Sequence, residues 1–394
     1  MDGSDKKSSV DGLPIQRVIK KEKKNKKTMP VKEDEMPLKK VKTEKAFSIP
    51  ELNDQSVSSE GWENHLNWEK SVKCREVLEA LCSSVEPRRK RKPQLTKTQV
   101  WLYVGNSTVK RIITADSVSE ESFDPLSKVD PEKLQTVLDF IKSDLEKDES
   151  GFADRGAVFY LRLMIPREAW PNNKYGWLHD THMASAMLML HRRSMQSPSP
   201  YSPRIAFLDR WFVQSWVNDY KKSHQTPNEL SERYSKAFNG EYPEQFVTGK
   251  KWLADVDTLF LCHHVNGDHW VALRIDLVKE VIHVYDCIPS VLSDKQLHEE
   301  CRPFTKMLPA LLNKMVEDPK LKTKRDKQFT YRRHKKIPKN EDPGDCGVYS
   351  LKYIECLALG RNFDGLSDQI IPSLRLKMGA DIYGEVAMED GCNW

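Results

Sequence analysis

The stretch DTLFLCHHVNGDHWVALRIDLVKEVIHVYDCI, residues 257–288, decides the fold of this chain. It contains three short apolar segments of strand-like length, at 257–265, 269–277 and 281–288. The links between them are short, and the first contains Asn-Gly-Asp, a sequence that favours a tight turn. The stretch therefore predicts an antiparallel meander of three strands.

The segments around the meander predict mainly helices. Apolar residues at helical spacing and helix-capping residues predict helices at 62–82, 131–147, 180–194, 206–222, about 293–316 and directly after Asp345. Apolar runs predict strands at 157–166 and 328–332. Helices and antiparallel strands segregated in this way indicate an α+β fold, with a central, mainly antiparallel sheet flanked by helices.

The composition excludes several classes of protein. The chain has 394 residues and a net charge of +5, but residues 1–50 alone carry 14 Lys and Arg against 8 Asp and Glu. The chain after residue 50 holds 49 of the 63 basic and 50 of the 58 acidic side chains, so it is nearly neutral. Nucleic-acid binding is therefore not indicated for the main domain. No apolar run reaches about 18 residues, so neither a membrane span nor a secretory signal is predicted.

Cysteine usage bears on the compartment and on metals. The eight cysteines are spread thinly, without the C-x-x-C spacing of zinc sites. Together with the missing secretory signal, this pattern predicts reduced thiols in the cytosol or nucleus. We expect neither a metal site nor a cofactor.

One cysteine has the surroundings of a nucleophile. In NEDPGDCGVYSLKYIECL (340–357), Cys346 begins an apolar helix, where backbone N–H groups and the helix dipole favour a thiolate. His269 opens the second strand of the meander and Asp286 ends the third, and a short connection places those two ends side by side. We therefore predict Cys346 as the nucleophile, His269 as its base and Asp286 as the group that orients the base.

Other residues compete for these roles. His263 and His264 are alternative bases, although both precede the turn on the neighbouring strand. Cys262 and Cys287 lie within apolar strands, where burial makes a thiol inert. The prediction rests on the joint occurrence of the three residues, because each of them alone is more often structural.

Several of these segments resemble a known family. The segments at 265–277, 281–286 and 344–357 are similar to the catalytic segments of the ubiquitin-like protein proteases, the SUMO-protease type of papain-like cysteine peptidase. KYGWLHDTHM (174–183) is similar to the family's Trp-Leu-x-Asp segment. The resemblance covers roughly residues 170–384. GDCGVYSLKYIECLA further resembles the plant branch, which includes members carried by transposable elements.

The resemblance implies a papain-like fold and a substrate. Proteases of this family cleave after a Gly-Gly tail that threads between tryptophans, and Trp177 and Trp270 stand at the matching positions, with Asp180 fixing the tail. Glycine lacks a Cβ, so flat aromatic walls would select it by excluding every other residue. The alternative for both tryptophans is ordinary core packing.

One position departs from the family's pattern. The family places a Gln shortly before the nucleophile, where its amide donates to the oxyanion, but KIPKNEDPGDCG (336–347) contains no Gln. Alignment puts Lys339 in its place, and Asn340, six residues before Cys346, is the alternative amide donor. Losing one such donor costs roughly 10²–10³ in turnover, so we expect weakened activity.

The N-terminal region contains possible sites of SUMO attachment and a possible nuclear import signal. Residues 1–50 are predicted to be disordered, because a lysine-rich segment poor in aromatics buries too little apolar surface. Three tetrapeptides in it, around Lys20, Lys32 and Lys42, resemble SUMO acceptor sites. The alternative is that a segment so rich in Lys and Glu contains them by chance. PRRKRKP (87–93) resembles a nuclear import signal that would bind an import receptor; the alternative is a solvated linker.

These observations combine into one hypothesis of organisation and function. We predict a disordered tail (1–50), a helical extension of unknown function (51–150), a catalytic domain (151–384) and a C-terminal tail (385–394). The catalytic domain is predicted to be a cysteine protease that cleaves after the Gly-Gly of SUMO or a related modifier, in the nucleus and also in the cytoplasm. The alternatives are an inactive, transposon-derived relative that only binds a ubiquitin-like protein, and an acyltransferase on the same scaffold.

Overall fold

The computed structural model describes residues 68–84, 123–147, 155–223, 231–317, 327–341 and 344–388. The predictions for the tail at 1–50 and for the basic block at 87–93 lie outside these residues. Within the described ranges, no helix combines the length and the apolar character that crossing a bilayer requires.

A five-stranded mixed sheet forms the centre of the fold. In spatial order its strands are β1 (Ile205–Phe207), β2 (Thr258–Val265), β3 (His269–Asp276), β4 (Val281–Tyr285) and β5 (Thr330–His334). The central three strands pair antiparallel and confirm the predicted meander, while both outer strands pair in parallel. The turn from β2 to β3 works because Asn266 and Gly267 both adopt positive φ, at 57° and 81°.

The described helices surround this sheet. They are α2 (Val72–Ser84), α5 (Pro131–Leu145), α6 (Ala157–Met164), α7 (Asp180–Met195), α8 (Arg210–Ser223), α9 (Glu232–Phe238), α10 (Asp294–Glu300), α11 (Arg302–Met315), α12 (Cys346–Ala358) and α13 (Ile371–Ile382). A single π-helical turn, Tyr383–Ala387, extends α13. The predicted α+β class is confirmed. The predicted helix at 293–316 divides into α10 and α11 at Cys301.

Two segments differ from the sequence prediction. Residues 157–166, predicted as a strand, form the helix α6, which ends before Pro166. A short apolar run cannot be assigned by periodicity, and every residue of α6 except Val158 is buried because the helix packs against α5 and α13. Residues 206 and 207, predicted as the start of a helix, belong to strand β1. They are buried beside β2, and the helix α8 begins three residues later.

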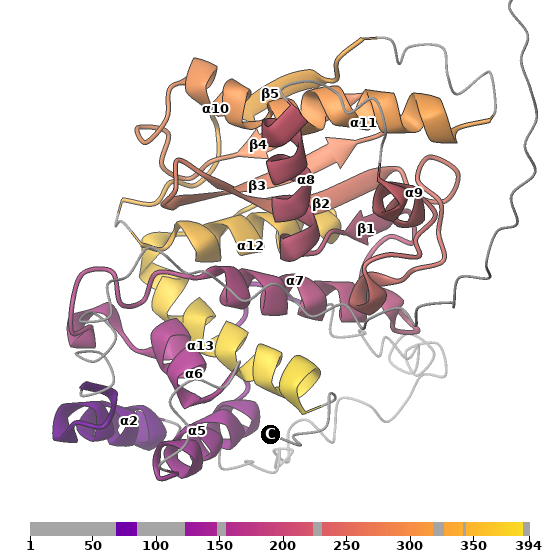
Figure 1. Cartoon of the computed structure of the whole chain (residues 1–394). Coiled ribbons are helices and arrows are strands. Elements are labelled where there is room, and N and C mark those ends of the chain that lie inside the picture. The colour runs from indigo at the N-terminus through magenta and orange to yellow at the C-terminus, as the bar shows by residue number, and fades with distance from the viewer. Residues whose placement is uncertain are drawn as a thin grey trace, which may run out of the picture. The chain divides into compact units, whose positions relative to one another are not determined.

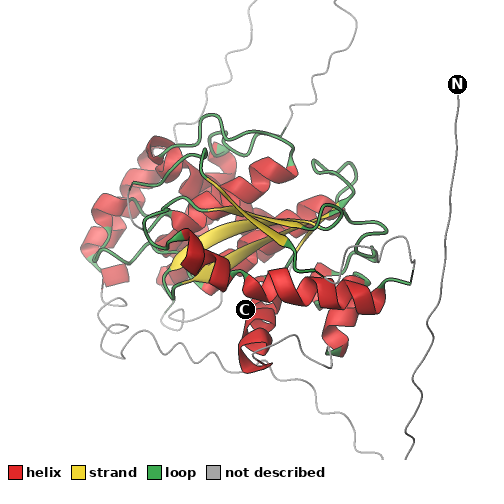
Figure 2. Ribbon diagram, turned by 90° about the horizontal axis from the view of Figure 1, so that it is seen from above, coloured by secondary structure: helices red, strands yellow, loops and turns green. Residues whose placement is uncertain are grey.

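The sheet separates two apolar cores. Alternate side chains of the central strands face opposite ways, so that Ala272 of β3 joins one core and Leu273 the other. One core contains α2, α5, α6, α7, α12 and α13, and the second contains α8 to α11. Figure 2 shows the sheet between these helices, and Figure 1 shows α12 directly against it with α7 beneath.

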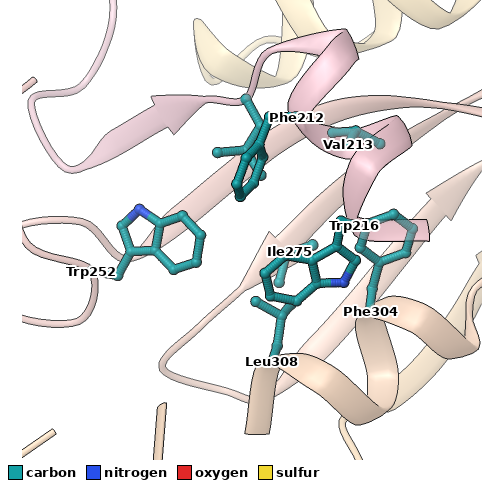
Figure 3. A pocket seen from close by; sticks show the side chains of 8 residues that line it. Phe212, Val213, Trp216, Trp252, Ile275, Phe304 and Leu308 are labelled. Carbon is teal, nitrogen blue, oxygen red and sulfur yellow. The ribbon is translucent and has the colours of Figure 1, made fainter. Parts of the chain in front are cut away.

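The second core encloses a small cavity. Its volume is about 10 Å³, roughly the space of one water probe, between α8, α11 and the sheet (Figure 3). Its lining is apolar throughout: Leu208, Phe212, Val213, Trp216, Trp252, Ile275, Phe304 and Leu308. A cavity of this size and lining is a packing defect, so it offers no room for a substrate.

Buried charges fasten α12 to its neighbours. The guanidinium of Arg193 on α7 donates to Glu355 on α12 at 2.8 Å and to Asp381 on α13 at 2.9 Å. It also donates to Glu385 at 2.6 Å. Lys352, buried on α12, adds a further bond to Glu355 at 2.7 Å. These contacts stabilise the later part of α12, around Glu355.

We predict that Arg193→Met lowers the free energy of unfolding by about 3–5 kcal/mol, because it leaves three acidic side chains without their shared partner. Urea denaturation followed by circular dichroism would measure this loss. The control is Arg302→Met, which removes an exposed pair with Glu299 and should cost less than about 1 kcal/mol. Equal losses in the two variants would show that the Arg193 cluster does not stabilise the fold.

Candidate active site

Cys346 is the first residue of α12. The residue is 5% exposed, and its thiol lies within interaction range of the imidazole of His269. The preceding Gly344 adopts a φ of +107°, a conformation that favours glycine and sets the turn into the helix. The thiol therefore lies beside an imidazole and at a helix N-terminus, where the dipole favours negative charge.

The imidazole of His269 connects the thiol to a carboxylate. Its Nε2 lies 2.8 Å from Oδ1 of Asp286, and both side chains are almost completely buried. The backbone N–H of Ile288 donates to the same Oδ1 at 2.9 Å. The structure thus brings the three predicted catalytic residues together in the order thiol, imidazole, carboxylate.

The charges in this group support one another. Burial alone would lower the pKa of His269, but the hydrogen bonds with Asp286 and Cys346 and their negative charge raise it to about 9. For Asp286, burial opposes ionisation, yet the bond from His269 and the nearby Arg333 hold its pKa below the ordinary value. The site therefore stabilises an imidazolium next to a carboxylate.

Arg333 on β5 completes the surroundings of Asp286, and the sequence reasoning missed it. Its Nη2 donates to Oδ2 of Asp286 at 2.6 Å, so both carboxylate oxygens are occupied. Arg333 is itself held by Asp294 at 2.7 Å and by the carbonyl oxygen of Leu292 at 2.9 Å. In the sequence it belongs to the basic run YRRHKK (331–336), which carries no signal of a contact with Asp286.

The alternative bases are placed elsewhere. Nε2 of His263 bonds to the carbonyl oxygen of Glu300, and burial lowers the pKa of His263 to about 3. The ring of His264 lies 4.5 Å from the ring of Trp270, and burial lowers its pKa as well. His269 bonds to Asp286 and lies beside Cys346, as the proposed base requires.

The predicted substrate-binding residues border one backbone segment. Trp177 is half-buried next to Leu178, and the indole Nε1 of Trp270 donates to the carbonyl oxygen of Leu178 at 2.9 Å. Oδ1 of Asp180 accepts a bond from Nε of Arg210 at 2.7 Å. The Arg210 guanidinium lies 5.0 Å from the ring of Trp270. Asp180 thereby helps to hold Trp270 in place.

The two predicted oxyanion donors differ in burial. The side chain of Asn340 is 5% exposed, and its backbone N–H donates to the carbonyl oxygen of Cys287 at 3.0 Å, one residue beyond Asp286. Lys339 is exposed to solvent. Of the two, Asn340 is the residue that the fold carries inward beside the catalytic group.

The other described cysteines and possible metal ligands do not form a second site. Cys262 and Cys287 are 1% exposed, and burial raises the pKa of both thiols. The seven cysteines within the described ranges are free thiols. Among the same residues, no group of three or more His, Cys, Asp or Glu side chains is arranged to hold a metal ion.

Comparisons with known proteins fit this geometry. The sequence model of the Ulp1 protease family, C-terminal catalytic domain, matches residues 176–388, which is more than half of the chain and includes Cys346, His269 and Asp286. No curated protein matches the sequence.

Three solved structures match this chain at low sequence identity and with TM-scores below 0.5. The C-terminal Ulp1 protease domain in complex with Smt3, the yeast orthologue of SUMO, is 15% identical over 67% of this chain and 99% of that chain, with a TM-score of 0.45. The Ulp1-like SUMO protease catalytic domain of Chaetomium thermophilum is 12% identical over 66% and 91%, with a TM-score of 0.39. The Xanthomonas campestris effector XopD bound to ubiquitin is 18% identical over 51% and 89%, with a TM-score of 0.29.

We predict that the ring of His269 titrates with a midpoint near pH 9, and that Asp286→Asn moves this midpoint toward 6.5. Because folding raises this pKa, the stabilising contribution of His269 is complete below about pH 6.5 and is lost as the pH rises through 9. NMR of histidine-labelled protein would measure the midpoint, with His269→Gln identifying the signal. A wild-type midpoint at or below 6.5 would contradict the stabilised imidazolium.

Proposed function

This chain belongs to the Ulp1 protease family, and from that membership we propose that it is a cysteine protease that cleaves after the C-terminal Gly-Gly of SUMO or a related ubiquitin-like modifier. The bond would be the peptide bond of a precursor or the isopeptide bond of a conjugate. The observation that supports the proposal is the arrangement of Cys346 beside His269, with His269 bonded to Asp286, within the family-matched residues.

The first half of the reaction would form an acyl-enzyme. The thiolate of Cys346 attacks the carbonyl carbon of the terminal glycine, and a C–S bond forms. When the tetrahedral intermediate collapses, the C–N bond breaks and the imidazolium of His269 gives its proton to the leaving amine. Asp286 keeps the imidazole in the orientation that both steps need. The product is a thioester between the modifier and Cys346.

The second half would release the modifier. His269, now neutral, takes a proton from water, and the resulting hydroxide attacks the thioester carbonyl. The C–S bond breaks, the glycine leaves as a carboxylic acid, and the imidazolium again faces the thiolate of Cys346. Every proton in this cycle moves through the one imidazole, which is why a second base is not required.

Asn340 is the proposed side-chain donor to the oxyanion. It is buried and tied to Cys287 beside the catalytic group, whereas Lys339 is exposed. The N-terminal N–H groups of α12 would supply the other donors, since the helix begins at Cys346. Asn is one methylene shorter than the Gln of the family pattern, so the bond would be longer and the stabilisation weaker.

Two further parts of the proposal rest on sequence alone. The basic block at 87–93 supports a nuclear location, which the protein would reach by binding an import receptor. The resemblance of residues 344–358 to the plant branch supports a plant-type member of the family. Trp177 and Trp270 are proposed, from the structure, to border the Gly-Gly tail, because Trp177 lies against Gly344 and Trp270 bonds to Leu178, which lies against Gly347.

Covalent trapping tests the proposed function. Full-length protein and its Cys346→Ser variant would be mixed with SUMO, NEDD8-type and ubiquitin probes that carry a C-terminal electrophile. We expect an adduct on the wild type alone, and the reacting probe would identify the modifier. Specific binding of a probe without an adduct would contradict the protease proposal and favour the binding-only alternative. Transfer of an acyl group from a thioester donor to a protein would favour the acyltransferase.

We predict that Asn340→Ala lowers kcat by about 10²–10³ with little change in KM, since the lost donor acts on the oxyanion of the transition state. Lys339→Ala is the matched neighbour and should leave kcat within about threefold of wild type, as expected of an exposed side chain outside the site. Cleavage of a SUMO–peptide fusion would give both constants. If Lys339→Ala causes the larger loss, the assignment of the two residues is wrong.

A further inference from the structure

Two segments that flank the catalytic group lie directly against each other. A Cβ added to Gly344 would lie 2.5 Å from Nε1 of Trp177, and one added to Gly347 would lie 2.9 Å from Cβ of Leu178. These distances are far shorter than ordinary van der Waals contact, so each glycine is the only residue that fits unchanged. The segment before and around Cys346 is therefore in close contact with the tryptophan segment at 176–178.

Arg375, on α13, reaches both segments with one guanidinium. Its Nε and Nη2 donate to Oδ1 of Asp345 at 2.8 and 2.5 Å, directly beside Cys346. The same Nη2 donates to the carbonyl oxygen of Gly176 at 2.9 Å and to that of Gly344 at 3.3 Å. The side chain thus ties the residue before the nucleophile to the residue before Trp177.

The surroundings of Arg375 set it apart from an ordinary surface ion pair. The residue is 3% exposed, and Nη1 donates to the carbonyl oxygen of Leu163 at 3.2 Å. The guanidinium lies 5.4 Å from the ring of Trp170, against which Gly176 packs. Burying a guanidinium is costly, and apolar side chains of similar volume often stabilise a fold equally well or better. A buried arginine that bonds to two loop carbonyls and a carboxylate fits a positioning role.

We propose that Arg375 is a positioning residue that holds Cys346 in register with the tryptophan segment at 176–178. This inference rests on the proposed function, because that segment is where a Gly-Gly tail would be guided to the thiol. Arg375 does not bond to Cys346, His269 or Asp286 and would act through Asp345 and the two glycine carbonyls. Its loss would misalign the tail and the thiol while leaving the hydrogen bond between thiol and imidazole in place.

Two variants and a matched control test this role. Arg375→Lys keeps the charge but lacks the planar fork that serves several acceptors, and Arg375→Met removes the donors altogether. Arg193→Lys is the control, because Arg193 is another buried arginine, bound to Glu355 rather than to Asp345. Residue 355 lies nine residues along α12 from Cys346, which is about 13 Å at 1.5 Å per residue. Thermal denaturation would establish that each full-length variant is folded.

Three readouts separate positioning from general stability. Alkylation of Cys346 by iodoacetamide reports the thiol and its imidazole, without a tail. Cleavage of a SUMO–peptide fusion reports the aligned tail. Hydrogen–deuterium exchange at residues 174–178 and 344–347 reports the contact between the segments and needs no substrate. For Arg375→Met we expect kcat for the fusion to fall about 100-fold, alkylation to stay within about threefold, and exchange to rise in both segments. For Arg375→Lys we expect kcat for the fusion to fall about tenfold.

The outcomes are distinct. Wild-type exchange in both segments of Arg375→Lys, or an equal rise in the Arg193→Lys control, would overturn the positioning role whatever the substrate is. Alkylation that falls in parallel with cleavage would also overturn it, because Arg375 would then act on the thiol. If the wild type cleaves no fusion, the proposed function fails, while hydrogen exchange still decides the role of Arg375.

Discussion

The pairing of β3 with β4 is the constraint on which the rest of the site depends. Ala272 lies opposite Tyr285. With this register, Nε2 of His269 at one strand end lies 2.8 Å from Oδ1 of Asp286 beyond the other. A shift by one residue would turn every side chain of the strand to the opposite face, so the two apolar cores also hold the imidazole in place. Arg333 on the neighbouring strand fixes the second carboxylate oxygen. The sheet thus supplies the base and its orienting acid.

The nucleophile comes from a helix that is held at both ends by buried charges. At its N-terminus, Asp345 is bound by Arg375, and nine residues later Glu355 is bound by Arg193. Removing one partner from such a pair leaves an uncompensated buried charge, so the pairs resist displacement of the helix. Gly344 and Gly347 set the distance between the segment around Cys346 and the tryptophan segment at 176–178, because no side chain separates the two segments.

The sequence predicted that Cys346, His269 and Asp286 lie together, because each stands at the end of an element whose type is readable. It wrongly assigned residues 157–166 as a strand, since a short run that is buried on nearly every side has no readable helical or strand period. Arg333 and Arg375 were missed because an arginine in a basic or mixed segment resembles a solvated charge, and only the fold shows that both point inward. Alignment favoured Lys339 as the oxyanion donor, whereas burial favours Asn340. Burial depends on long-range contacts that spacing does not encode.

The most direct measurement compares two tails on one substrate. Full-length protein would be given a SUMO–peptide fusion with the native Gly-Gly before the scissile bond, and the same fusion with Ala in the penultimate position. The proposed approach to Cys346 predicts that kcat/KM falls at least about 100-fold for the Ala tail, since its Cβ would keep the carbonyl away from the thiol. Equal rates for the two tails would contradict the account, because the tryptophans would then not select the substrate.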